Sequence, residues 1–98
     1  MRAAFIQSQA RLDLLEIWHY IAPNSISAAN KVIDRIHQEI NGLAEMPGKG
    51  HRRADVRNAG YRFWRVYSYM IAYIFDDKTI TIIRVVHGSR NFRRLFRA

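Results

Sequence analysis

The arginines in the second half of the chain are the side chains best suited to chemistry. Arg62, Arg65 and Arg84 interrupt segments that otherwise consist of apolar and aromatic residues. A guanidinium in such a setting needs a carboxylate, a carbonyl or an outside partner, because an unpaired buried charge is very costly. Arg84 could form a structural ion pair with an acid such as Asp55, or it could form one wall of a binding site for phosphate or carboxylate groups. The residue pattern leaves both interpretations open.

His87 lies three residues after Arg84 and three residues before Arg90. A single histidine at the end of a strand is usually a hydrogen-bonded core or rim residue. Between two arginines it could instead act as an acid or base in RNA cleavage, because imidazole titrates near neutral pH.

The remaining polar residues do not form a recognisable catalytic or metal-binding pattern. The serines lack the context of a nucleophile elbow, and Gly48-Lys49-Gly50 is too short for a phosphate-binding glycine loop. The chain has no cysteine, and its histidines are not spaced as metal ligands. These histidines are His19, His37, His51 and His87. We therefore expect no metal, no cofactor and no complete catalytic site.

Aromatic residues alternate with arginines after residue 60, a pattern similar to a surface that stacks nucleic-acid bases. The simpler interpretation is that most of these rings belong to the hydrophobic core. The residues concerned are Tyr61, Phe63, Trp64, Tyr67, Tyr69, Tyr73 and Phe75.

Positive charge is concentrated in one half of the sequence. The formal net charge of +8 divides into four basic and five acidic groups over residues 1–48 (−1) and twelve basic and three acidic groups over residues 49–98 (+9). Such asymmetry indicates a face that binds an acidic protein or a nucleic acid, although solubility alone is the simpler alternative.

Length and composition predict one globular domain over residues 1–98. An apolar fraction of 49% can supply a hydrophobic core. The lack of cysteine excludes disulfides and favours a reducing compartment, so we expect the cytoplasm. No apolar run approaches the roughly 20 residues that span a bilayer, so we expect no membrane partner.

Hydrophobic periodicity predicts two helices near the start of the chain. Residues 2–6 form a strand, and a helix capped by Ser8 follows it. A second helix, capped by Ser25 or Ser27, ends near Glu45. The short connection between the helices implies an antiparallel hairpin.

After a loop over residues 48–60, the sequence predicts three strands joined by short turns. These strands are Tyr61–Val66, Tyr69–Phe75 and Thr79–His87. The middle one is apolar on both faces, as a central strand would be. A basic tail follows, with Phe92, Leu95 and Phe96 as apolar anchors. The expected fold is α+β, with order β-α-α-β-β-β and a helix hairpin packed on a small, mainly antiparallel sheet.

Four stretches together resemble the RelE/ParE superfamily of bacterial type II toxins. Residues 10–22 and 28–36 are similar to its two helices, and residues 43–50 are similar to the motif that ends the second helix. The sequence from Ile80 to Arg90 (ITIIRVVHGSR) is similar to its last strand and glycine turn. One departure is Tyr67-Ser68, where ParE-like chains often have glycine between two strands.

The resemblance implies a toxin that is held inactive by a cognate acidic antitoxin in a hetero-oligomer. ParE-like members poison DNA gyrase and contribute to plasmid stabilisation, whereas RelE-like members cut messenger RNA in the ribosome. The ending from Arg84 to Arg90 and the Met46-Pro47-Gly48 segment resemble the ParE-like branch. The C-terminal tyrosine of several ribonuclease members has no counterpart, since the last tyrosine is Tyr73.

We therefore expect a gyrase inhibitor, with two alternatives: a ribosome-dependent endoribonuclease, or a non-toxic co-repressor that binds the antitoxin. The residues expected to bind the target are Arg57, Arg62, Arg65, Arg84, His87 and Arg90. Those expected to bind the antitoxin are Leu15, Trp18, Ile36, Ile40, Arg62 and Arg93. A ribonuclease would use Arg65 and Arg84 to stabilise charge at the phosphate and His87 to transfer a proton.

Overall fold

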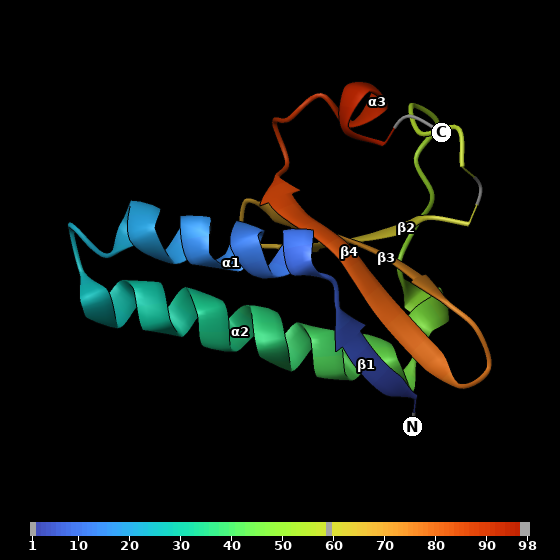
Figure 1. Ribbon diagram of the computed structural model, residues 1–98, viewed down its shortest axis with the longest axis horizontal. Helices are drawn as coiled ribbons and strands as arrows, with labels where there is room; N and C mark the ends of the chain where they lie inside the picture. The colour runs from blue at the N-terminus through green and yellow to red at the C-terminus, as the bar shows by residue number, and fades with distance from the viewer. Residues whose placement is uncertain (1, 59, 97–98) are drawn as a thin grey trace.

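A computed structural model describes residues 2–58 and 60–96 (Figure 1). The elements in chain order are β1 (Ala3–Ile6), α1 (Ser8–Ile21), α2 (Ile26–Glu45), the short 3-10 helix η1 (Pro47–Lys49), β2 (Arg62–Val66), β3 (Tyr69–Phe75), β4 (Thr79–His87) and α3 (Phe92–Leu95). This order confirms the predicted β-α-α-β-β-β fold and adds two short helices. None of the described helices is long and apolar enough to cross a membrane.

The four strands form one sheet in the order β1-β4-β3-β2. β1 runs parallel to β4, and the other neighbours are antiparallel. Along β4, Arg84 pairs with Ala72 and Ile82 pairs with Tyr73, so Ile83 is an extra residue that makes a bulge. The bulge lies directly before Arg84 and changes the direction in which the following side chains point.

A hydrophobic cluster lies on each face of the sheet. On one face the helix hairpin packs against the strands (Figure 1). Ile36, Leu43 and Tyr73 are fully buried there. On the other face Phe63 of β2 contacts the rings of Phe92 and Phe96 from the C-terminal tail. The tail therefore closes a second core, and β3 is buried on both sides as the sequence predicts.

The helix starts show one correct and one wrong cap prediction. The hydroxyl of Ser25 accepts a hydrogen bond from the backbone N–H of Ala28 at 3.0 Å, so Ser25, rather than Ser27, caps α2. Ser8 is the first residue of α1, and Gln7 precedes it without a side-chain cap. The backbone N–H of Gln7 still donates to Ile82 O at 3.0 Å, so the hydrogen bonding of the strand continues directly up to the helix. Gln7 therefore takes the cap position, and Ser8 is already inside the first turn.

One backbone conformation and one side-chain hydroxyl determine the connections around the sheet. In the turn between β2 and β3, Tyr67 has a φ of 54°, a left-handed conformation that is unfavourable for a tyrosine. At the end of η1, the buried hydroxyl of Tyr73 accepts from the Gly50 N–H at 3.0 Å and donates to Pro47 O. This hydroxyl holds η1 against the sheet, and its burial raises the pKa of Tyr73.

Candidate functional site

A buried ion pair joins α1 to β4. Asp13 is only 4% exposed, and its carboxylate accepts from Arg84 Nε at 2.8 Å and from Arg84 Nη2 at 3.0 Å. The same carboxylate accepts from the backbone N–H of Val85 at 3.0 Å. β1 ends at Ile6, opposite Ile82, and does not extend as far as Val85. The Asp13 carboxylate therefore accepts the hydrogen bond from the Val85 N–H that a neighbouring strand would otherwise accept. The hydrogen bond to Asp13 raises the pKa of Arg84.

This pair gives Arg84 a structural partner, which is the first of the two interpretations that the sequence left open. Its carboxylate partner is Asp13, whereas Asp55 binds Arg53 at 2.9 Å, which lowers the pKa of Asp55. Asp13 and Arg84 are 71 residues apart, so local spacing could not reveal the pair. The available signal was a single acid on the apolar face of a helix, among Ala10, Leu14 and Ile17.

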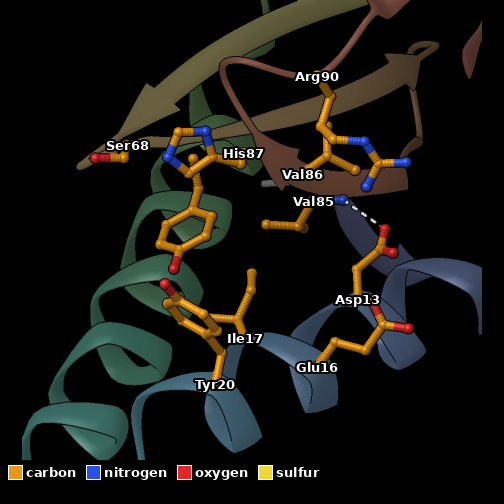
Figure 2. Close-up of a pocket in the computed structure, with 10 residues that line it drawn as sticks. Asp13, Glu16, Ile17, Tyr20, Ser68, Val85, Val86, His87 and Arg90 are labelled. Atoms are coloured by element: carbon orange, nitrogen blue, oxygen red, sulfur yellow. Dashed lines mark hydrogen bonds between the residues drawn. The ribbon is translucent and has the colours of Figure 1, made fainter.

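A pocket of about 540 Å³ opens beside this ion pair, between α1, the turn before β3 and the end of β4 (Figure 2). Its lining combines apolar, aromatic and charged side chains from distant parts of the sequence. The lining residues are Asp13, Glu16, Ile17, Tyr20, Ser68, Tyr69, Val85, Val86, His87 and Arg90. Two of the predicted site residues, His87 and Arg90, therefore lie in the same pocket.

The ring of His87 is oriented by its neighbours. Its Nδ1 accepts from the backbone N–H of Ser89 at 3.1 Å and lies 2.7 Å from the Ser89 hydroxyl. When Nδ1 accepts these hydrogen bonds, Nε2 is the ring nitrogen that carries a proton. The ring also makes an edge contact with Tyr69, with 5.9 Å between centroids. His87 can therefore donate a hydrogen bond from Nε2 to a bound group.

The other predicted target-binding arginines do not share one face. Arg62 lies opposite Tyr73, on the helix side of the sheet, and its Nη1 donates to Gly50 O at 3.1 Å. Arg65 lies opposite Met70, on the tail side, because side chains alternate along a strand. Arg57 is exposed in the loop before β2. The predicted single basic face is therefore divided between the two sides of the sheet.

Most of the described basic side chains in the second half have no acidic partner within the described chain. Eleven Lys and Arg residues lie in the described part of residues 49–96, and only Arg53 and Arg84 form ion pairs there. The charges of the other nine are therefore not compensated by a carboxylate within the described chain. No group of three His, Asp or Glu side chains among the described residues is placed to hold a metal ion.

Comparison with known families identifies the chain. Residues 5–92 match the family of the ParE toxin of the type II toxin-antitoxin system, parDE. This protein belongs to the ParE toxin family. It is thus a toxin of the ParE/RelE superfamily, which confirms the resemblance in its sequence. No curated protein matches it.

Solved structures show the same fold as this ParE family member. The chromosomal ParDE toxin-antitoxin system from P. aeruginosa includes a chain that is 21% identical, with a TM-score of 0.73 over 89% of this chain and 96% of that one. The toxin-antitoxin complex RelBE2 from Mycobacterium tuberculosis includes a chain that is 26% identical, with a TM-score of 0.54 over 88% and 96%.

The residues predicted to bind an antitoxin occupy very different environments in this ParE toxin. Leu15 is 56% exposed on α1, and Trp18 is partly covered, with its Nε1–H donating to Asn30 Oδ1 at 2.8 Å. Ile36 and Ile40 are 0% and 2% exposed, because both lie on the side of α2 that faces the sheet. These two isoleucines belong to the core and not to the surface that a partner meets. Arg62 is half-buried, and Arg93 is exposed on α3.

Proposed function

We propose that this ParE toxin inhibits DNA gyrase by binding, and that a cognate acidic antitoxin neutralises it in the cytoplasm. The observation that carries the proposal is the set of nine described basic side chains that have no carboxylate partner in the described chain. Unpaired charges of one sign attract an oppositely charged partner and speed its association. Gyrase with its bound DNA presents such a partner.

The placement of the ribonuclease candidates favours binding over RNA cleavage. Cleavage would require Arg65, Arg84 and His87 to converge on one phosphate. Arg84 makes a bidentate bond to Asp13, so its charge is already neutralised. Arg65 starts from the tail side of the sheet and its guanidinium reaches the turn at Gly88, where a Cβ would lie 3.1 Å from its Nη2, whereas His87 lines the pocket on the helix side. A binding function needs no such convergence.

The antitoxin part of the proposal rests on the solved relatives, which are themselves toxin-antitoxin systems. An acidic antitoxin would offset the positive charge of this chain and compete with the target for the same arginines. We expect a hetero-oligomer in which the antitoxin also covers apolar residues such as Leu15.

Supercoiling by purified gyrase tests the proposal. The wild-type toxin should stop supercoiling and trap cleaved DNA. In the double variant Arg57→Gln/Arg90→Gln, the concentration for half-inhibition should rise at least tenfold, because two exposed guanidinium groups are lost. The matched control, Arg35→Gln, removes an exposed arginine from the acidic half of the chain and should change nothing.

Each other outcome supports a different function. Normal supercoiling without trapped DNA excludes the gyrase proposal. Codon-linked cleavage of translated messages, lost in His87→Gln, would instead identify a ribosome-dependent endoribonuclease. Normal growth when the chain is expressed alone would identify a co-repressor without toxicity.

A further inference from the structure

The pocket beside α1 is electrically balanced, although the chain carries a net charge of +8. Arg84 neutralises Asp13, and the remaining charged residues of the lining, Glu16 and Arg90, have opposite signs. The Nδ1 of His87 is occupied by its hydrogen bonds to Ser89. A phosphate backbone would therefore gain little attraction here, unlike at the eight described unpaired basic side chains that lie outside the pocket.

The walls of the pocket suit an apolar group. Val85 and Val86 of β4 and Ile17 of α1 are buried and present apolar surface to the pocket (Figure 2). Tyr20 points into the same space from α1, yet it is 81% exposed. A volume near 540 Å³ is large enough for a bulky side chain with its flanking backbone. Covering an exposed aromatic ring beside such a pocket is typical of the centre of a protein–protein interface.

The polar residues at the rim define how a partner would lie. Glu16 is on the α1 side of the pocket, and His87 and Arg90 are on the β4 side (Figure 2). A carboxylate of the partner would be repelled by Glu16 and would be attracted by Arg90 and by the Nε2–H of His87. The pocket therefore fits an apolar side chain that is followed by an acidic residue pointing toward β4.

We propose that the antitoxin inserts one large apolar or aromatic side chain into this pocket, with an adjacent carboxylate on Arg90. The inference rests on the proposed function, since it assigns a contact point to that acidic partner. It assigns the apolar pocket to a protein side chain, and Arg90 at its rim belongs to the arginines for which antitoxin and target compete.

Two small probes test the character of the pocket directly. Amide resonances of the ¹⁵N-labelled protein should shift at Glu16, Tyr20, Ser68 and Val86 when N-acetyl-tryptophanamide is added. Inorganic phosphate should leave these residues unchanged. If phosphate shifts them first, or if neither probe shifts them, the proposal is overturned. The measurement does not involve gyrase, so a negative supercoiling result refutes the proposed target and leaves this result interpretable.

Variants then test the partner. Ser68→Trp should fill the pocket from the exposed turn, and Tyr20→Ser should remove the ring at its mouth. Both should weaken binding of a purified cognate antitoxin by at least tenfold in Kd. Ile26→Ser removes another exposed apolar residue, 61% exposed and outside the pocket, and should bind as the wild type does. Equal Kd values for all four proteins would refute the assignment.

Discussion

At the scale of single residues, the position of Arg84 shows how a charge is accommodated within an apolar strand. Its partner Asp13 also accepts the backbone N–H of Val85, so one carboxylate satisfies two polar groups. Within the described residues, no buried side-chain nitrogen or oxygen lacks a hydrogen-bond partner. The ion pair is therefore a structural connection between α1 and β4, and the pocket depends on its position.

Arg84→Met should lower the free energy of unfolding by about 3–5 kcal/mol, because Asp13 would remain buried without its partner. Arg90→Met, at an exposed arginine of the same pocket, should change it by less than about 0.5 kcal/mol. Urea unfolding of both variants measures the difference. Equal stabilities would show that the pair contributes little. Loss of toxicity in Arg84 variants therefore needs to be corrected for unfolding before it is read as loss of a binding contact.

Gly50 is required for space and not for its backbone conformation. A Cβ at this position would lie 2.1 Å from the hydroxyl oxygen of Tyr73, whereas a Cβ at Gly48 would meet nothing within 4 Å. We expect Gly50→Ala to destabilise the protein by about 1–3 kcal/mol, as overpacking does. Gly48→Ala is the matched control and should be nearly neutral. Thermal unfolding of the two variants compares them, and a neutral Gly50→Ala would contradict the packing around Tyr73.

At the scale of elements, periodicity predicts the strands and helices well but not the contacts between them. The alternation in β4 and the apolar face of α2 are visible locally, so their ends agree closely with the structure. The partner of Arg84 and the burial of Ile36 and Ile40 depend on which faces meet. The bulge at Ile83 likewise depends on the pairing of two strands. Such contacts form over long sequence separations, which a local pattern does not encode.

The turn at Tyr67 carries a conformational cost that a substitution can isolate. A left-handed φ costs a residue with a Cβ about 1–2 kcal/mol, and glycine avoids this cost. Tyr67→Gly should therefore be more stable than Tyr67→Ala by about 1 kcal/mol, since both remove the same ring. Equilibrium denaturation gives both values. If alanine is as stable as glycine here, the turn is not strained.

At the scale of the whole molecule, two cores on one thin sheet make stability sensitive to the ionisation of buried groups. Tyr73 lies in the core on the helix side, and burial raises the pKa of its phenol above 10.0. The pKa of Tyr69 is raised in the same direction, first by burial and then by Tyr20. Folding therefore keeps these phenols protonated at a pH at which the unfolded chain would lose the protons.

Stability should fall as the pH rises above about 10, because the unfolded state then releases phenolic protons that the folded state retains. Below that pH the phenols are protonated in both the folded and the unfolded state, and their contribution to stability is fully present. Tyr73→Phe should be less stable at pH 8, since the Gly50 N–H loses its acceptor. Between pH 8 and pH 11, the free energy of unfolding of Tyr73→Phe should then decrease by less than that of the wild type. Urea titrations at the two pH values measure this, and identical losses would argue against a raised pKa in Tyr73.

The parallel pairing of β1 with β4 determines when the molecule can be completed during its synthesis. Ala3 lies beside Thr79, so the first strand leaves the ribosome 76 residues before its hydrogen-bond partner. Until β4 emerges, the helix hairpin has no finished sheet beneath it, and the Asp13 carboxylate has no guanidinium to bind. Pairing of this kind closes late and slowly. A nascent chain therefore lacks both the finished sheet and the pocket proposed for the antitoxin until its last strand has formed.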